Sequence, residues 1–161
     1  MKGNTKIIDL LNKQLTLELT SMDQYLAHSK LYEDWGINKL HDQLTHEHEE
    51  ELDHAKRLIE RILFLEGTPD TASREPLLIG DNVEQMLKND LTAEYTVAES
   101  LRNIIEVCEQ ERDYVTREIL EVLLSDTETD HIYWLEQHLG LIEKIGIFNY
   151  IQSQMNSDKA V

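Results

Sequence analysis

The chain has 161 residues, enough for one domain with a real core, and its two prolines and six glycines favour an all-α fold. The formal net charge of −17 argues against nucleic acid, whose phosphates would be repelled, and suits a protein that attracts cations. With one cysteine and no apolar segment typical of a signal peptide or a membrane span, we expect a cytoplasmic protein with no membrane partner.

Apolar residues recur at helical spacing along the chain and predict five helices within one domain, residues 1–161. Residues 67–82 hold both prolines and are too many for a tight helical hairpin, so they predict a long crossover. We therefore expect a four-helix bundle with one long crossover and a short fifth helix. The expected helices are 5–34, 38–66 with Asn38 as N-cap, 83–111, 113–139 with Asp113 as N-cap, and 147–155.

Each long helix carries acidic residues on its apolar face. On a helical wheel Glu51 falls among Leu40, Leu44 and Leu58, with His54 one turn away. Glu18 on the first helix and Glu94 on the third lie among apolar residues in the same way. A second Glu-x-x-His pair, Glu128 and His131, occurs in the fourth helix. These residues are expected to point into the core.

The heights of these residues in the bundle also agree. Glu18 and the Glu51/His54 pair are symmetric about the turn near Gly36, and Glu94 and the Glu128/His131 pair are symmetric about the turn near Arg112. The second set repeats the first at offsets of 76 or 77 positions, which indicates two related hairpins. All six side chains are therefore expected at one level.

Four carboxylates and two imidazoles in a bundle core repel one another and lose hydration unless cations join them. One Glu from each of two helices and a Glu-x-x-His from each of the other two form the ligand set of di-iron and di-manganese carboxylate proteins. A single such pair is typical of a solvated helix, but two pairs opposed by core-facing glutamates predict a metal centre. Asp90 is either a residue that orients a ligand histidine or a plain helix-start acid, and Glu47 is either a spare ligand or a pore-side carboxylate.

The apolar stripe of the fourth helix changes side partway along. Val115, Ile119, Val122 and Leu123 lie roughly 140° or more from Glu128 on a helical wheel, whereas the residues after His131 cluster close to it. One additional residue would advance a helix by about 100°. The sequence "LLSDTET" therefore predicts a π-type bulge within residues 120–129, next to a functional site.

Two further apolar stripes indicate oligomerisation. The first helix carries Ile8, Leu15, Leu19 and Leu26 away from the metal face, and the second carries Leu52, Ile59 and Leu63. This is more apolar surface than one bundle is expected to hide, so a twofold dimer is predicted.

The sequence resembles the bacterioferritins from end to end. The resemblance rests on "MKGNTKIIDLLNKQL", "ELTSMDQY", "YEDWG", "RILFLEG", "GLIEKIGIFNYIQSQ" and the six positions named above. It implies a ferritin-like bundle in a hollow 24-subunit iron-storage cage, with a ferroxidase centre that oxidises Fe(II) with O2 or H2O2. The implied ligands are Glu18, Glu51, His54, Glu94, Glu128 and His131, with Glu51 and Glu128 bridging. The family also implies a ferredoxin as reductant.

The resemblance extends to residues around this centre. Tyr25, Trp35 and Trp134 match aromatics that the family keeps near it, either to supply electrons or for packing. His46 and Glu50 match an inner-surface iron site, although Glu50 replaces the usual Asp. A solvated charged face is the alternative for the latter pair.

One departure concerns haem. Haem-binding bacterioferritins use a methionine on the second helix, and this chain has Leu52 at that position. No haem b is therefore expected from this chain alone, and the chain resembles the non-haem, ferritin-A-like branch. A cage mixed with a haem-binding paralogue remains an alternative.

Other functional classes use the same ligand set. Di-iron peroxidases of the rubrerythrin kind carry a Cys-x-x-Cys module, which a chain with one cysteine lacks. A small-molecule di-iron oxidase needs a substrate pocket, for which the leucines around the site give little support. An inert helical bundle needs no matched Glu and His levels.

Overall fold

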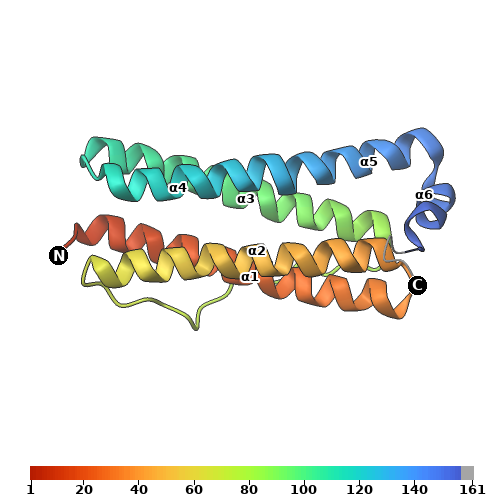
Figure 1. Cartoon of the computed structure of the whole chain (residues 1–161), viewed down its shortest axis with the longest axis horizontal. Helices are drawn as coiled ribbons and strands as arrows, with labels where there is room; N and C mark the ends of the chain where they lie inside the picture. The colour runs from red at the N-terminus through yellow and green to blue at the C-terminus, as the bar shows by residue number, and fades with distance from the viewer. Residues whose placement is uncertain (157–161) are drawn as a thin grey trace.

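The structure is a computed structural model that describes residues 1–156. Within them the chain forms four long helical rods and one short helix, with no β-strand (Figure 1). The elements are α1 (Thr5–Asp34), α2 (Asn38–Phe64), α3 (Val83–Gln110), α4 (Tyr114–Asp126), η1 (Thr127–Ile132), α5 (Tyr133–Ile145) and α6 (Ile147–Gln154). None of these helices is long and apolar enough to cross a membrane.

Two antiparallel hairpins make up the bundle. In Figure 1, α1 and α2 form one hairpin, and α3 forms the other with the continuous rod of α4, η1 and α5. Gly36, with φ of 75°, turns the chain between α1 and α2, and Arg112, with φ of 58°, turns it between α3 and α4. The predicted fold class is confirmed.

Helix bounds agree closely with the sequence prediction, with two differences. Asp113 caps α4 as predicted, since its side chain accepts a hydrogen bond from the Thr116 N–H. Asn38, predicted as an N-cap, is instead the first residue of α2, and Ile37 precedes it without a side-chain cap. The fourth rod runs on to Ile145, six residues past its predicted end, because Leu141 and Ile142 continue to pack on the core.

Residues 65–82 form the crossover, which is tied to the bundle by buried polar groups. The Gln24 side chain accepts a hydrogen bond from the Leu78 N–H (3.0 Å), and His28 Nε2 accepts one from the Gly80 N–H (3.3 Å). Asp90 accepts hydrogen bonds from both Gln24 and His28, each at 2.8 Å. Asp90 therefore orients the crossover and His28, which is not one of the predicted ligand histidines.

The hydrophobic core consists of two clusters at opposite ends of the bundle. One surrounds Leu11, Leu58 and Leu120, and the other surrounds Leu44 and Leu87. Along the helices between these clusters lie six buried acidic and histidine side chains: Glu18, Glu47, Glu51, His54, Glu94 and His131. Apolar packing at both ends thus holds the four rods at a fixed spacing around a polar centre.

The fourth rod contains the predicted π-helical segment. Residues Thr127–Ile132 are π-helical, and the Tyr133 N–H bonds to the Glu128 carbonyl five residues earlier. Core positions Leu120, Leu123 and Thr127 are spaced by three and four residues, whereas Thr127, His131 and Leu135 are spaced by four. The bulge is confirmed, although the stripe used to predict it was partly wrong. Val115 and Val122 are exposed, and Leu120 takes the core position instead.

The predicted second apolar stripes are only partly available for an interface. Leu15 and Leu19 are buried within the chain itself, because the core cluster that includes Leu58 covers them. Leu26, Leu52 and Leu63 are exposed.

Candidate metal centre

Five of the six predicted ligands meet in the middle of the bundle. Glu18 comes from α1, Glu51 and His54 from α2, Glu94 from α3 and His131 from η1, and none is more than 2% exposed. Their donor atoms fall into two groups that could each hold a metal ion, Glu18/Glu51/His54 and Glu51/Glu94/His131. Glu51 is the residue that the two groups share.

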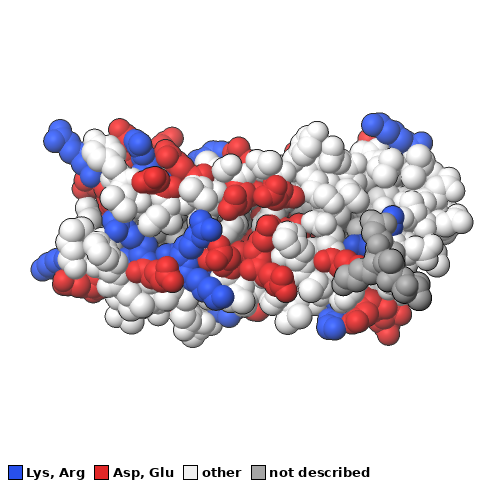
Figure 2. Space-filling view, in the orientation of Figure 1, with Lys and Arg blue, Asp and Glu red and all other residues white. Residues whose placement is uncertain are grey.

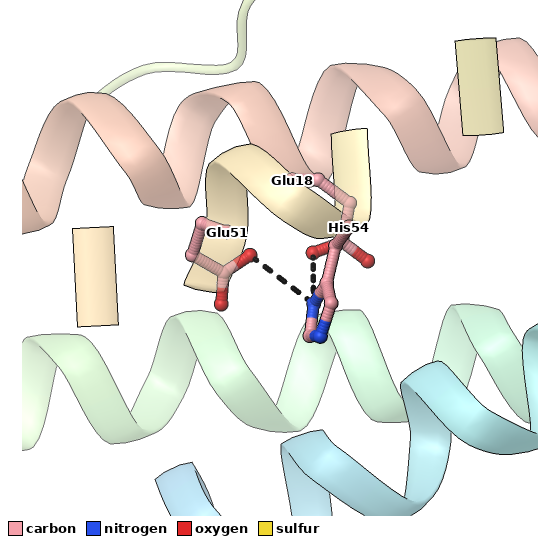
Figure 3. Close-up of side chains that lie close together, drawn as sticks. All are labelled: Glu18, Glu51 and His54. Carbon is pink, nitrogen blue, oxygen red and sulfur yellow. Dashed lines mark ion pairs between the residues drawn. The ribbon is translucent and has the colours of Figure 1, made fainter. Parts of the chain in front are cut away.

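The first group is formed by α1 and α2. Figure 3 shows the Glu18 and Glu51 carboxylates directed at the same nitrogen of His54. Nδ1 of His54 lies 3.5 Å from Glu18 Oε2 and 3.8 Å from Glu51 Oε2. These distances leave room for an ion among the three groups.

The second group places His131 between two glutamates. Nδ1 of His131 lies 3.0 Å from Glu51 Oε1 and 3.3 Å from Glu94 Oε1. The two oxygens of Glu51 therefore face different imidazoles, which is the geometry of a bridging carboxylate. The rings of His54 and His131 are nearly parallel, with centroids 6.0 Å apart.

Several of these buried atoms have no hydrogen-bond partner. They include both oxygens of Glu51, Oε2 of Glu18 and Glu94, and Nδ1 of both histidines. Leaving such groups unsatisfied in a core costs about 1–3 kcal/mol each, and more when they are charged. The donor atoms thus fit a pair of cations that prefer oxygen and imidazole ligands.

Proton affinities in this cluster are strongly perturbed. Burial and the charges of Glu18 and Glu94 raise the pKa of Glu51 well above its ordinary value. Burial alone would lower the pKa of His131, but the surrounding carboxylates, Glu94 foremost, raise it well above 6.5. Burial alone would raise the pKa of Glu18, but its interactions with the neighbouring Glu51 and His54 lower it to about 2. Without metal, protons on Glu51 and His131 offset part of the negative charge.

Glu128, the sixth predicted ligand, is not in the cluster. Its side chain is about half exposed, and Oε1 lies 2.6 Å from Nη2 of Arg102 on α3. The expectation that Glu128 faces the core assumed α-helical winding between residues 128 and 131. A π-helical turn contains more residues, so the residue four positions before His131, Thr127, shares its face, and Glu128 is turned outward.

The outer nitrogens of both histidines contact three further carboxylates, of which the sequence analysis singled out Glu47 and Glu50 but not Asp126. Nε2 of His131 lies 2.7 Å from Glu47 and 2.9 Å from Glu50, and Nε2 of His54 lies 3.4 Å from Asp126. Glu47 is buried, so its position near the core stripe was a usable signal. Asp126 had no such signal, because its direction depends on the π-helical segment that follows it.

Of the other predicted residues, Tyr25, His46 and Glu50 lie around this cluster. Trp35 is instead 40% exposed at the end of α1, beside Tyr32, and Trp134 stacks on His138. The Tyr25 hydroxyl donates a hydrogen bond to Glu94, and its ring meets that of His131 edge to face. Burial and the charge of Glu94 raise the pKa of Tyr25 well above 10. His46 is exposed, and its Nε2 lies 3.2 Å from Glu50, whose other oxygen contacts His131. His46 and Glu50 thus connect the surface to the cluster.

The surface of the bundle also carries negative charge. Figure 2 shows acidic side chains gathered near the middle of the face on which α2 lies beside the fourth rod. An acidic surface of this kind raises the local concentration of cations.

Comparison with known proteins identifies the family of the chain. The family model for the ferritin-like domain matches residues 8–145. A bacterial ferritin of Synechocystis is 51% identical over 156 residues, which is 97% of this chain and all of the relative. A bacterial ferritin of Pseudomonas aeruginosa is 50% identical over 155 residues, which is 96% of this chain and all of the relative. A bacterioferritin of Brucella melitensis is 41% identical over 160 residues, which is 99% of this chain and 98% of the relative. The chain therefore belongs to the ferritin family.

Proposed function

We propose that this protein is an iron-storage ferritin whose buried centre is a ferroxidase that oxidises Fe(II) to Fe(III). The observation that carries the proposal is the Glu51 carboxylate, which has no hydrogen-bond partner and lies between two imidazoles with one oxygen toward each. Two Fe(II) ions bound there each lose one electron, and O2 or H2O2 accepts the pair. Membership of the family and the names of the relatives support storage of the product.

The chain's residues have distinct tasks in this proposal. Glu18 and His54 bind one ion, Glu94 and His131 bind the other, and Glu51 holds both at a short separation. A short separation favours removal of two electrons together over release of a one-electron product. Apolar packing on both sides of the centre limits access by water. Tyr25 holds Glu94 through its hydroxyl and, as a buried phenol, is a candidate electron donor.

His46 and Glu50 are proposed to connect the centre with the cavity. Glu50 contacts the exposed His46 on one side and the buried His131 on the other. Such a pair offers carboxylate and imidazole ligands to an ion on its way between the surface and the centre. Fe(III) leaving along this route would reach the acidic face, where hydrolysis builds the mineral.

Assembly into a cage is part of the proposal. A hollow 24-subunit homo-oligomer built from twofold dimers would cover the exposed Leu26, Leu52 and Leu63 and enclose the mineral. A ferredoxin is proposed as the reductant that releases the iron. Light scattering after size-exclusion chromatography measures the mass and separates a cage from a dimer.

Haem is not expected to bind a homopolymer of this chain. Leu52 is exposed on α2 and has no lone pair to offer iron. A Soret band in the purified homopolymer would contradict this expectation. A Soret band only in cages mixed with a methionine-bearing relative would favour the alternative of a mixed cage.

The decisive experiment is Fe(II) oxidation by Glu51→Gln. Because Glu51 belongs to both groups, its loss should reduce the initial rate by at least about 100-fold. Glu49→Gln is the matched control, since Glu49 is an exposed glutamate two residues away on the same helix. Equal rates for wild type and Glu51→Gln would refute the proposed centre.

A further inference from the structure

The Glu128 carboxylate and the Arg102 guanidinium form an ion pair beside the centre. Their closest atoms are 2.6 Å apart, and Arg102 also lies 3.7 Å from Glu99 on its own helix. Both partners are about half exposed. The pair joins α3 to the π-helical segment, at a point three residues before His131.

Charge explains why Glu128 lies outside the cluster. The centre already holds the carboxylates of Glu18, Glu47, Glu51 and Glu94, and a further carboxylate would be repelled. Arg102 offers the opposite charge at the surface. Two divalent cations would balance the charge of these four carboxylates, which removes the repulsion, and would offer an additional carboxylate a bond to metal.

The backbone provides a means for Glu128 to respond. Thr127 occupies the core-facing position, and its buried hydroxyl has no hydrogen-bond partner. Glu128 is the next residue, in a segment whose hydrogen bonds already depart from the α-helical pattern. Exposed ion pairs are weak, so a small gain at the centre is enough to separate Glu128 from Arg102.

We propose that Arg102 is a positioning residue that holds Glu128 outside the centre and releases it when divalent metal binds. Glu128 then turns inward and closes the side of the centre formed by the fourth rod. This inference rests on the proposed function, because it requires a metal centre in the bundle.

Co(II) binding to the metal-free, full-length assembly tests the proposal, since Co(II) can be titrated without Fe(II) oxidation. Arg102→Ala removes the competing partner and should tighten Co(II) binding about two- to five-fold. Arg102→Lys retains a cation and should rescue the wild-type affinity. In a Glu128→Gln background, Arg102→Ala should leave the affinity unchanged.

Loss of any positive charge near a cation site also favours cation binding, so a charge-matched control is needed. Lys88→Ala serves, because Lys88 lies six residues before Glu94 on α3 and pairs with Glu84, whereas Arg102 lies eight residues after Glu94. The Lys88→Ala change should leave Co(II) affinity near that of wild type. Equal tightening by Lys88→Ala and Arg102→Ala, or tightening by Arg102→Ala that persists with Gln at 128, would overturn the proposal.

A crystal structure of the Co(II)-loaded wild type provides the second measurement. The expected result is a Glu128 carboxylate against the metal and an Arg102 side chain without it. A loaded structure in which Glu128 still contacts Arg102 would overturn the inference and leave the proposed function intact. Failure of the wild type to bind Co(II) at all would instead contradict the proposed function.

Discussion

The two hairpins of the bundle contribute similar residues through differently wound helices. In the first hairpin, α1 and α2 are regular, and Glu18, Glu51 and His54 all face the core. In the second, α3 is regular and contributes Glu94, but the fourth rod contains a π-helical segment that buries His131 and exposes Glu128. A Glu-x-x-His spacing therefore places both side chains on one face only while the winding stays α-helical.

The same difference makes the surroundings of the two histidines unequal. Four carboxylates lie within ion-pair distance of His131, and three lie within that distance of His54. The contact of His54 with Asp126 is the longest of those made by an outer nitrogen, at 3.4 Å. The two metal positions should therefore differ in affinity.

Removing one ligand from each hairpin should break the centre in complementary ways. Glu18→Ala leaves the Glu51/Glu94/His131 group, and Glu94→Ala leaves the Glu18/Glu51/His54 group. Each variant should bind one Co(II) per subunit where wild type binds two, and each should oxidise Fe(II) about 10- to 100-fold more slowly. Isothermal titration and stopped-flow absorbance measure the two quantities. Two Co(II) ions per subunit in both variants would show that the groups are not separate metal positions.

Changing the outer contacts of the histidines should separate the two positions further. Glu47→Gln removes a buried carboxylate 2.7 Å from His131 Nε2 and should weaken Co(II) binding about tenfold. Asp126→Asn weakens a longer, partly exposed contact and should cost only about two- to three-fold. Competition with a coloured chelator measures both affinities. A larger loss of Co(II) affinity in Asp126→Asn than in Glu47→Gln would contradict this prediction.

Deleting Thr127 should make the second hairpin resemble the first. Without the additional residue, the fourth rod is expected to become a regular α-helix, with Glu128 and His131 on one face. Co(II) should then bind about two- to five-fold more tightly, because Glu128 no longer leaves an ion pair at the surface. Thr127→Ala, which retains the chain length, is the control and should keep wild-type affinity. A crystal structure checks the winding, and persistence of the π-helical segment would contradict this interpretation.

The pH dependence of the free energy of unfolding should reveal the protons that Glu51 of the first hairpin and His131 of the second bind. The pKa of His131 is raised, so its protonation stabilises the metal-free fold fully below 6.5, and this stabilisation is lost as pH rises through the folded-state pKa. The pKa of Glu51 is raised too, so ionisation of Glu51 is easier in the unfolded chain, and the metal-free fold loses stability as the pH rises above 4.5. The lowered pKa of Glu18 acts only at acidic pH, because its contribution is present above 4.5 and is lost as pH falls toward about 2.

The melting temperature of the metal-free protein is therefore expected to fall by a few degrees between about pH 6 and pH 9. Glu51→Gln has no carboxyl to ionise there and should show a smaller decrease. Saturating Co(II) should abolish the decrease, since the ions replace the protons. Differential scanning calorimetry measures all three curves, and a wild-type melting temperature that rises over this range would contradict the assignment.

Most of the architecture follows from the sequence alone, because helix periodicity, caps and breaks are local properties. The bounds of α1 and α3, the cap at Asp113 and the crossover are readable from neighbouring residues. The sequence also predicts which acidic and histidine side chains of the regular helices face the core, because regular winding fixes direction by spacing: Glu18, Glu51, His54 and Glu94. Even the bulge is visible as a change in the apolar stripe near Thr127.

Only the tertiary structure decides where the side chains of the bulge point and what they meet. Glu128 turns outward because a π-helical turn changes its angle to His131 and because Arg102, from another helix, offers an opposite charge. Glu47, Glu50 and Asp126 reach the histidines only through packing between helices that are far apart in sequence. These directions depend on contacts between rods, which no spacing within one rod encodes.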